Sequence, residues 1–213
     1  MRRSWLILSL LLAMVFAYHN PWMLHKTAVF TWNAFDLAEG ASLHPDIRAE
    51  SPTLLTPLYL RLPLVMIGVM IAIIAAQLRD ERWRWIWRGI AILVVLRLNP
   101  PIDFYPFGNE DANYNQLGYL MFSGLGLIGL VTVGSHWIKG ISIPLLIIAL
   151  GLTLYSSIIG YRTAIDTFQR VGLDVDIGGG LVMFVSLALC VGALAVLPPL
   201  VQYIQKARKL PAS

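Results

Sequence analysis

Two arginines stand where an apolar chain rarely places a charge. Arg61 lies inside an apolar run at about 54–78, and Arg97 closes the next apolar run. A charge at membrane depth costs roughly 2.5–3.5 kcal/mol or more, so it usually faces protein or water. We expect both guanidinium groups to pair with carboxylates of the neighbouring loops, for example Asp36 or Asp103. In the alternative interpretation, the two arginines line a site for an anion or a lipid headgroup.

Carboxylates are frequent in the loops that adjoin these arginines. Asp36 and Glu39 are three residues apart, which places them on one helical face and could support acid–base chemistry. The same spacing is typical of a solvated helix face. The charged cluster predicted as a binding site comprises Arg61, Arg97, Asp36, Glu39, His44, Asp103, Glu110 and Asp111.

Calcium-binding patterns in these loops are incomplete. Asp111, Asn113 and Asn115 have the i, i+2, i+4 spacing of the first ligands of a calcium loop. However, Gln116 stands where the sharp turn needs glycine, and Phe122 stands where a bidentate glutamate is needed. A solvated acidic face is therefore the simpler interpretation.

Other motifs assign no reaction. His44 could ligate a metal together with a neighbouring acid, but no further ligand stands at a metal-binding spacing. Residues 124–129 match G-x-G-x-x-G, yet they lie inside an apolar run, where such glycines indicate helix packing. No P-loop, His-Glu-x-x-His or Cys-x-x-Cys occurs. The sequence therefore predicts no catalytic residue and no metal, and it leaves the cofactor unknown.

The elements that carry these residues follow from the distribution of charge. Ten of the twelve carboxylates lie in three connecting stretches, 19–53, 99–116 and 162–180. Basic residues concentrate in the other connections and at the termini, as retention of Lys and Arg in the cytoplasm requires. This alternation predicts a polytopic protein of a bacterial inner membrane with the acidic loops outside and both termini cytoplasmic. The basic residues concerned are Arg2, Arg3, Arg79, Arg82, Arg84, Arg88, Lys139, Lys206, Arg208 and Lys209.

Composition gives the same class of protein. The chain is 57% hydrophobic and 13% charged, whereas soluble domains carry about 25% charged residues. We expect one all-α transmembrane domain, because no stretch outside the apolar runs could build its own core. The net charge of +4 is explained by residues that flank membrane segments, so nucleic acid is not an expected partner.

Six segments are predicted to cross the bilayer. A span needs ~20 residues, so the short third segment crosses only if Trp83 and its neighbouring arginines reach back to the interface. The first segment follows Met1-Arg2-Arg3 and is expected to be an uncleaved signal anchor. The predicted spans are about 5–18, 54–78, 83–98, 117–133, 141–161 and 181–204.

The longest acidic loop should contain two short amphipathic helices that lie on the membrane. Residues 33–39 form the first, with Gly40 as its stop, and residues 42–50 form the second. The three glycines at 178–180 predict a flexible entry into the last span. The single cysteine, Cys190, is expected to be a small packing residue.

These features favour a non-catalytic accessory or structural subunit of an inner-membrane complex. The predicted spans carry almost no ionisable groups at mid-depth and show no inverted repeat, which argues against transport. Their small residues suit close contact with other integral membrane proteins and with lipids. The alternatives are a small transporter or carrier, and a membrane enzyme that acts on a lipid-linked substrate at the outer face.

Overall fold

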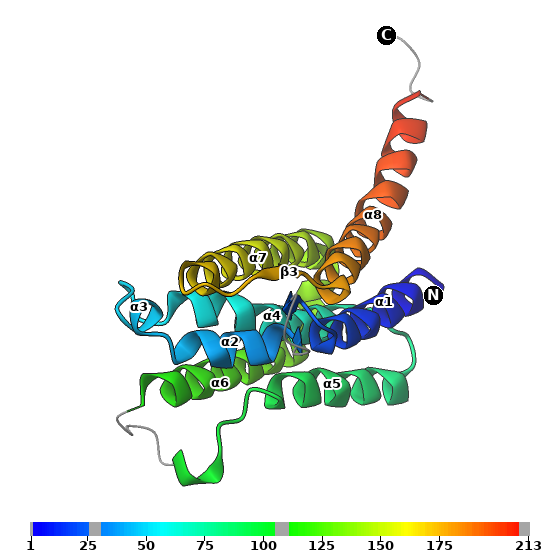
Figure 1. Cartoon of the computed structure of the whole chain (residues 1–213). Helices are drawn as coiled ribbons and strands as arrows, with labels where there is room; N and C mark the ends of the chain where they lie inside the picture. Colours follow the sequence, from blue (N-terminus) through cyan, green and yellow to red (C-terminus); the bar gives the residue numbers. More distant parts are fainter. Residues whose placement is uncertain (1, 26–30, 105–110, 209–213) are drawn as a thin grey trace.

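Six long helices form an antiparallel bundle in the computed structural model, which describes residues 2–25, 31–104 and 111–208 (Figure 1). The predicted all-α class is therefore confirmed, and each predicted span coincides with a helix. The helices are α1 (Arg2–His19), α4 (Leu55–Ala75), α5 (Glu81–Leu96), α6 (Ala112–Val133), α7 (Ser135–Arg170) and α8 (Gly179–Arg208).

The apolar helix α4 is the centre of this bundle. It packs against α1, α5, α6 and α7. In its most apolar window 78% of the residues are buried, against 28% for α8 at the edge. Small residues allow the close contacts: a Cβ on Gly160 of α7 would lie 2.9 Å from Cβ of Tyr59. Burial on all sides explains why this stretch is apolar all round.

Four of the described helices are long and apolar enough to cross a membrane: α4, α6, Gly140–Arg170 of α7 and Gly179–Leu197 of α8. The chain therefore has the helices of a multi-pass membrane protein. The other two predicted spans coincide with α1 and α5, which have 18 and 16 residues. A helix of 16 residues is about 24 Å long, shorter than the ~30 Å hydrocarbon core.

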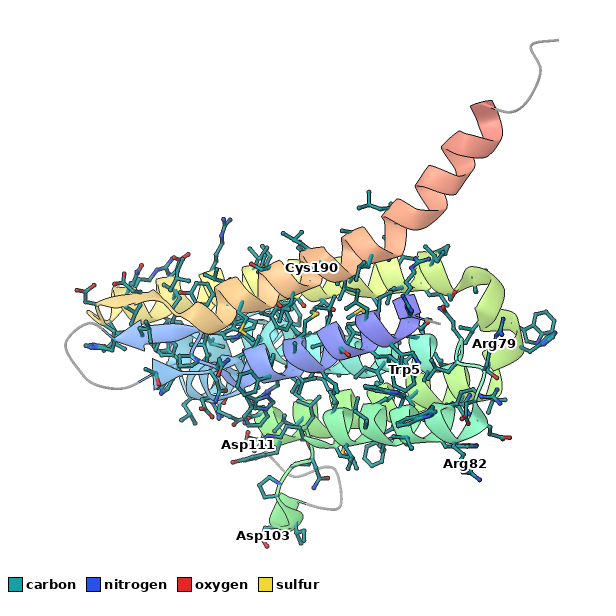
Figure 2. The ribbon with its side chains drawn as sticks, turned by 90° about the vertical axis from the view of Figure 1, so that its right-hand side faces the viewer. Trp5, Arg79, Arg82, Asp103, Asp111 and Cys190 are labelled. Carbon is teal, nitrogen blue, oxygen red and sulfur yellow. The ribbon has the colours of Figure 1, made fainter. Side chains whose placement is uncertain are left out.

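The charged connections lie at opposite ends of the bundle. We call the end where α1 finishes and α4 begins the acidic end, and the other the basic end. Trp5 near the start of α1 meets Trp83 at the start of α5, with ring centroids 5.0 Å apart, at the basic end. In Figure 2, Trp5, Arg79 and Arg82 lie toward one end, and Asp103 and Asp111 lie far from them.

A small antiparallel sheet at the acidic end was not predicted. Its order is β2 (Thr31–Trp32), β1 (Met23–His25), β3 (Val175–Ile177), so it joins the segment after α1 to the segment before α8. Gly178 N donates to Trp22 O at 2.7 Å, and Gly180 N donates to Pro21 O at 2.8 Å. Gly178 and Gly180 are thus closely packed and hydrogen-bonded to the segment after α1, which differs from the flexible entry expected for residues 178–180.

Two short helices occupy the longest acidic loop, and each overlaps one of the predicted ranges 33–39 and 42–50 without sharing its bounds. They are α2 (Ala34–Ser42) and α3 (Pro45–Arg48). The first continues through Gly40 instead of stopping there, and a Cβ at Gly40 would lie 2.7 Å from the Trp32 ring. The buried face of α2 packs against α4, so the bundle itself covers the apolar side of this helix.

The last two helices differ from expectation in length and contact. The fifth span was predicted to end at about residue 161, but α7 runs unbroken to Arg170, so the first part of the predicted loop 162–180 is helical. Helix α8 starts beside α1, and its later part extends away from the bundle (Figure 1). Cys190 on α8 is exposed, so its predicted role in internal packing is wrong.

Candidate functional site

Three helices bring four polar side chains together at the acidic end. Arg61 comes from the second turn of α4, Glu39 from α2, and Asn113 and Gln116 from the first turns of α6. The Arg61 side chain is 0% exposed, although it carries a guanidinium group. We call these four residues the Arg61 cluster.

Hydrogen bonds within the cluster engage both terminal nitrogens of the guanidinium, whereas Nε of Arg61 is buried without a hydrogen-bond partner. Nη2 of Arg61 donates to Glu39 Oε1 at 2.7 Å and to Asn113 Oδ1 at 2.6 Å. Nη1 donates to Gln116 Oε1 at 2.8 Å. The carboxylate compensates the buried charge and the amides supply further acceptors, which is what a buried cation requires.

The amide groups then connect the cluster to its surroundings. Asn113 Nδ2 donates to Glu39 Oε2 at 3.0 Å, so this carboxylate accepts from two helices at once. Gln116 Nε2 donates to the Leu54 carbonyl at 2.9 Å, just before α4 begins. These side-chain hydrogen bonds therefore connect α2, α4 and α6 to one another.

Helix caps fix two of the three contributing helices. Asp111 Oδ1 accepts the backbone N–H of Asn113 at 2.9 Å, which caps α6 next to the residue that contacts Arg61. Asn33 Oδ1 accepts the backbone N–H groups of Phe35 and Asp36, which starts α2. Such caps satisfy N–H groups that the first turn leaves unpaired. The capping residues therefore fix where α2 and α6 begin, and so which of their side chains face Arg61.

A groove adjoins the cluster between the start of α4 and α6. It encloses about 430 Å³, and Gln116 belongs both to its wall and to the Arg61 cluster. The Glu39 side chain is 32% exposed, so solvent reaches the carboxylate while the guanidinium is sealed. The groove is lined by Thr53, Leu54, Leu58, Ala112, Asn115, Gln116, Tyr119, Leu120 and Ser123.

Of the eight predicted site residues, Arg61 and Glu39 meet directly. Neither of the carboxylates expected to pair with Arg61 does so. Asp36 lies on the exposed side of α2 and accepts from Asn33 Nδ2 at 2.6 Å. Asp103 lies in the short helix η1 (Ile102–Phe104), which projects from the bundle (Figure 2). The rotation of α2 about its axis explains the difference, because it turns Glu39 toward α4.

The remaining predicted residues stand apart from the cluster. The guanidinium of Arg97 lies over the Phe35 ring, 4.2 Å from its centroid, and does not join Arg61. His44 caps α3, where its Nδ1 accepts the Asp46 N–H at 3.3 Å. Asp111 approaches Arg48 at 3.8 Å. Glu110 lies outside the described residues.

Asn113 and Gln116 were not predicted as partners of Arg61. Their i, i+3 spacing at the start of α6 was the available signal, because it puts two amides on one helical face. The calcium-like spacing that drew attention to this segment is explained by a cap and a cluster contact. In the described residues, no three His, Cys, Asp or Glu side chains are grouped to hold a metal.

Comparisons with known proteins do not assign this chain to a family. Comparison with family models, with curated proteins and with solved structures finds no match for this chain. The function must therefore be argued from the residues themselves.

Proposed function

We propose that the chain is an accessory subunit of a bacterial inner-membrane complex and binds a partner membrane protein through α6. In this proposal all six long helices cross the bilayer, with the acidic end outside and both termini cytoplasmic. The alternation of basic and acidic connections supports this orientation.

The observation that carries the proposal is the outward position of two α6 glycines. Gly124 faces inward, where an added Cβ would lie 2.8 Å from Val95 and 3.1 Å from Val65. Gly126 and Gly129 point the other way, and an added Cβ at either would meet nothing within 4 Å. The glycine pattern of residues 124–129 is thus only partly explained by packing within this chain.

Outward glycines in a helix need a physical reason. Glycine destabilises a helix interior by roughly 0.5–1 kcal/mol relative to alanine, and lipid tails do not require its small size. A second transmembrane helix does, since small residues let two backbones approach closely. Exposed Tyr119, Phe122 and Leu130 flank the two glycines and would pack around an incoming helix.

The Arg61 cluster supports a structural role for the acidic end. Glu39 and the amides of Asn113 and Gln116 bind Arg61, which fixes α2 against α4 and α6. A fixed end keeps the α6 face and the adjoining groove in one arrangement, which limits the entropy lost when a partner binds.

Cysteine cross-linking in native membranes tests the proposal. The exposed Cys190 is first replaced by alanine, and single cysteines are then placed at Gly126 and Gly129 of α6. Gly151 of α7 is the matched control: its added Cβ also meets nothing within 4 Å, but no second glycine lies one turn away, so it does not form a small-residue face with a neighbour as Gly126 and Gly129 do. We expect adducts with the same membrane protein from positions 126 and 129, in stoichiometric yield, and none from position 151.

Two outcomes would contradict the proposal. Equal capture from positions 126, 129 and 151 would mean that α6 has no special face. Adducts between two copies of this chain alone would identify self-association in place of binding to another protein.

A carrier for a small polar solute is the second candidate, favoured by the buried charge itself. Ionisable residues at membrane depth mark transport pathways in many proteins, and here the carboxylate partner of Arg61 is reached by solvent. Flux of charged solutes into proteoliposomes that contain the purified chain would support this candidate. Absence of flux above empty vesicles would remove it.

A further inference from the structure

Two adjacent cavities lie at the basic end, far from the Arg61 cluster. One is lined by α1, the 77–80 connection and α5, and the other by α1, α4 and α7. Each holds about 240 Å³, and both include Ser4 and Gln77 in their walls. We call the pair the basic-end cavities.

The walls of these cavities combine cations with amphipathic aromatic rings. Arg3 lines one cavity and Arg79 the other, while Trp5 and Trp83 form an edge-to-face pair beside Arg79. Asp80 also lines this wall, but its Oδ1 accepts the Arg82 backbone N–H at 2.8 Å as the cap of α5. Arginine and tryptophan together are typical of the headgroup level of a bilayer.

The basic end contains several buried N–H donors that have no hydrogen-bond partner. In the described part of the chain, four buried N–H groups without a hydrogen-bond partner lie here. Buried donors are rarely left unpaired in folded proteins, so an absent acceptor is the expected explanation. The four groups are Arg3 Nε, Arg84 Nε, Trp87 Nε1 and Arg88 Nε.

Arg3 connects this donor excess to the cavities. Its Nη2 donates to the Ala195 carbonyl of α8 at 2.6 Å, which holds the guanidinium in place. Its Nε remains buried without an acceptor, and Arg3 lines the cavity between α1, α4 and α7. A phosphate oxygen is the acceptor that a guanidinium binds best, because the planar donor edge matches two oxygens.

We propose that the basic-end cavities bind the phosphate of an anionic phospholipid headgroup. A lipid fits better than free phosphate because the wall of one cavity includes the indole ring of Trp83, which is 44% exposed and offers an apolar surface next to the cations. This site is independent of the α6 face and of the proposed partner. It requires only that the basic end lies at a membrane surface.

Native mass spectrometry of the full chain, released from membranes in detergent, provides the test. Phosphatidylglycerol and phosphatidylcholine are added in separate titrations to the wild type and to the double variant Arg3→Gln, Arg79→Gln. The matched control is Arg2→Gln, Arg82→Gln, which removes the same charge at the same end from exposed positions outside the cavity walls. Circular dichroism melts confirm that both variants remain folded.

We expect the wild type to retain phosphatidylglycerol over phosphatidylcholine and the cavity variant to lose about tenfold or more in that affinity. The control variant should stay within about twofold of the wild type. Equal losses in both variants would overturn the proposal, since diffuse charge would then explain the binding. Competition by millimolar inorganic phosphate would also overturn it, because the site would then be one for the free anion.

Discussion

Arg61 Nη2 and Glu39 Oε1 lie 2.7 Å apart, and the two residues are exposed to very different degrees. The guanidinium is sealed in the protein, whereas the carboxylate side chain is 32% exposed. If the ion pair is broken, water can solvate the Glu39 carboxylate but not the Arg61 guanidinium. This difference in exposure determines which of the two residues can be replaced at the lower cost in folding free energy.

We predict that Glu39→Leu destabilises the protein more than Arg61→Leu. Loss of the carboxylate leaves a buried positive charge uncompensated, which costs about 3–5 kcal/mol. Loss of the guanidinium leaves a carboxylate that water can still reach. Unfolding free energies in detergent, measured for both single variants and the double variant, test this. Single variants of equal stability would show that burial of Arg61 does not control the energetics.

Arg97 should matter far less than Arg61. It is exposed and lies over the Phe35 ring, an interaction worth about 0.5–1 kcal/mol at exposed sites. We expect Arg97→Met to lower stability by no more than that amount, and Phe35→Leu to abolish the effect of changing Arg97. A thermodynamic cycle of these two substitutions measures the coupling. A loss of several kcal/mol from Arg97→Met would indicate a buried partner.

The three glycines at the start of α8, at positions 178–180, should differ sharply in their tolerance of substitution. A Cβ on Gly178 would overlap the Pro21 carbonyl, and one on Gly180 would lie 2.5 Å from Asn20 O. Gly179 has nothing within 4 Å of its added Cβ and serves as the control. We expect alanine at 178 or 180 to cost about 1–3 kcal/mol and alanine at 179 to change stability by no more than about 0.5 kcal/mol. Thermal melts of the three variants are sufficient, and a uniform response would contradict the close packing.

Single cysteines should reveal opposite compartments for the two ends. In the Cys190→Ala background, Asp46→Cys reports on the acidic end and His136→Cys on the basic end, and both positions are exposed. We expect an impermeant maleimide to label position 46 in intact cells and position 136 only after permeabilisation. Labelling of both positions from the same side would remove the membrane orientation on which the proposed function depends.

The helices were predictable from sequence because long apolar runs and their flanking charges are strong signals. The sheet was not, since β2 has two residues and β1 three, too few for alternation to appear. The glycines at 178–180 illustrate a related limit. The sequence shows that a glycine is permissive, but it does not show whether the backbone there is mobile or closely approached.

The candidate site was partly predictable for a comparable reason. A charge inside an apolar run indicated that Arg61 needs an acidic partner, and the structure provides one. The choice between Asp36 and Glu39 depends on how α2 is rotated, and burial of Leu37, Ala38 and Ala41 sets that rotation. Asp36 and Glu39 lie one turn apart on α2, and the position of α4 decides which one meets Arg61.

The pairing of the first helix with the last constrains biogenesis. Helix α1 packs against α8, and β1 pairs with β3, which immediately precedes α8. During synthesis, α1 leaves the ribosome first, yet its flank stays uncovered until the final segment has been made. The helices can therefore insert into the membrane one after another, but α1 and α8 cannot pack against each other until translation is nearly complete. A premature stop before residue 175 would leave the oldest part of the polypeptide open to quality-control proteases.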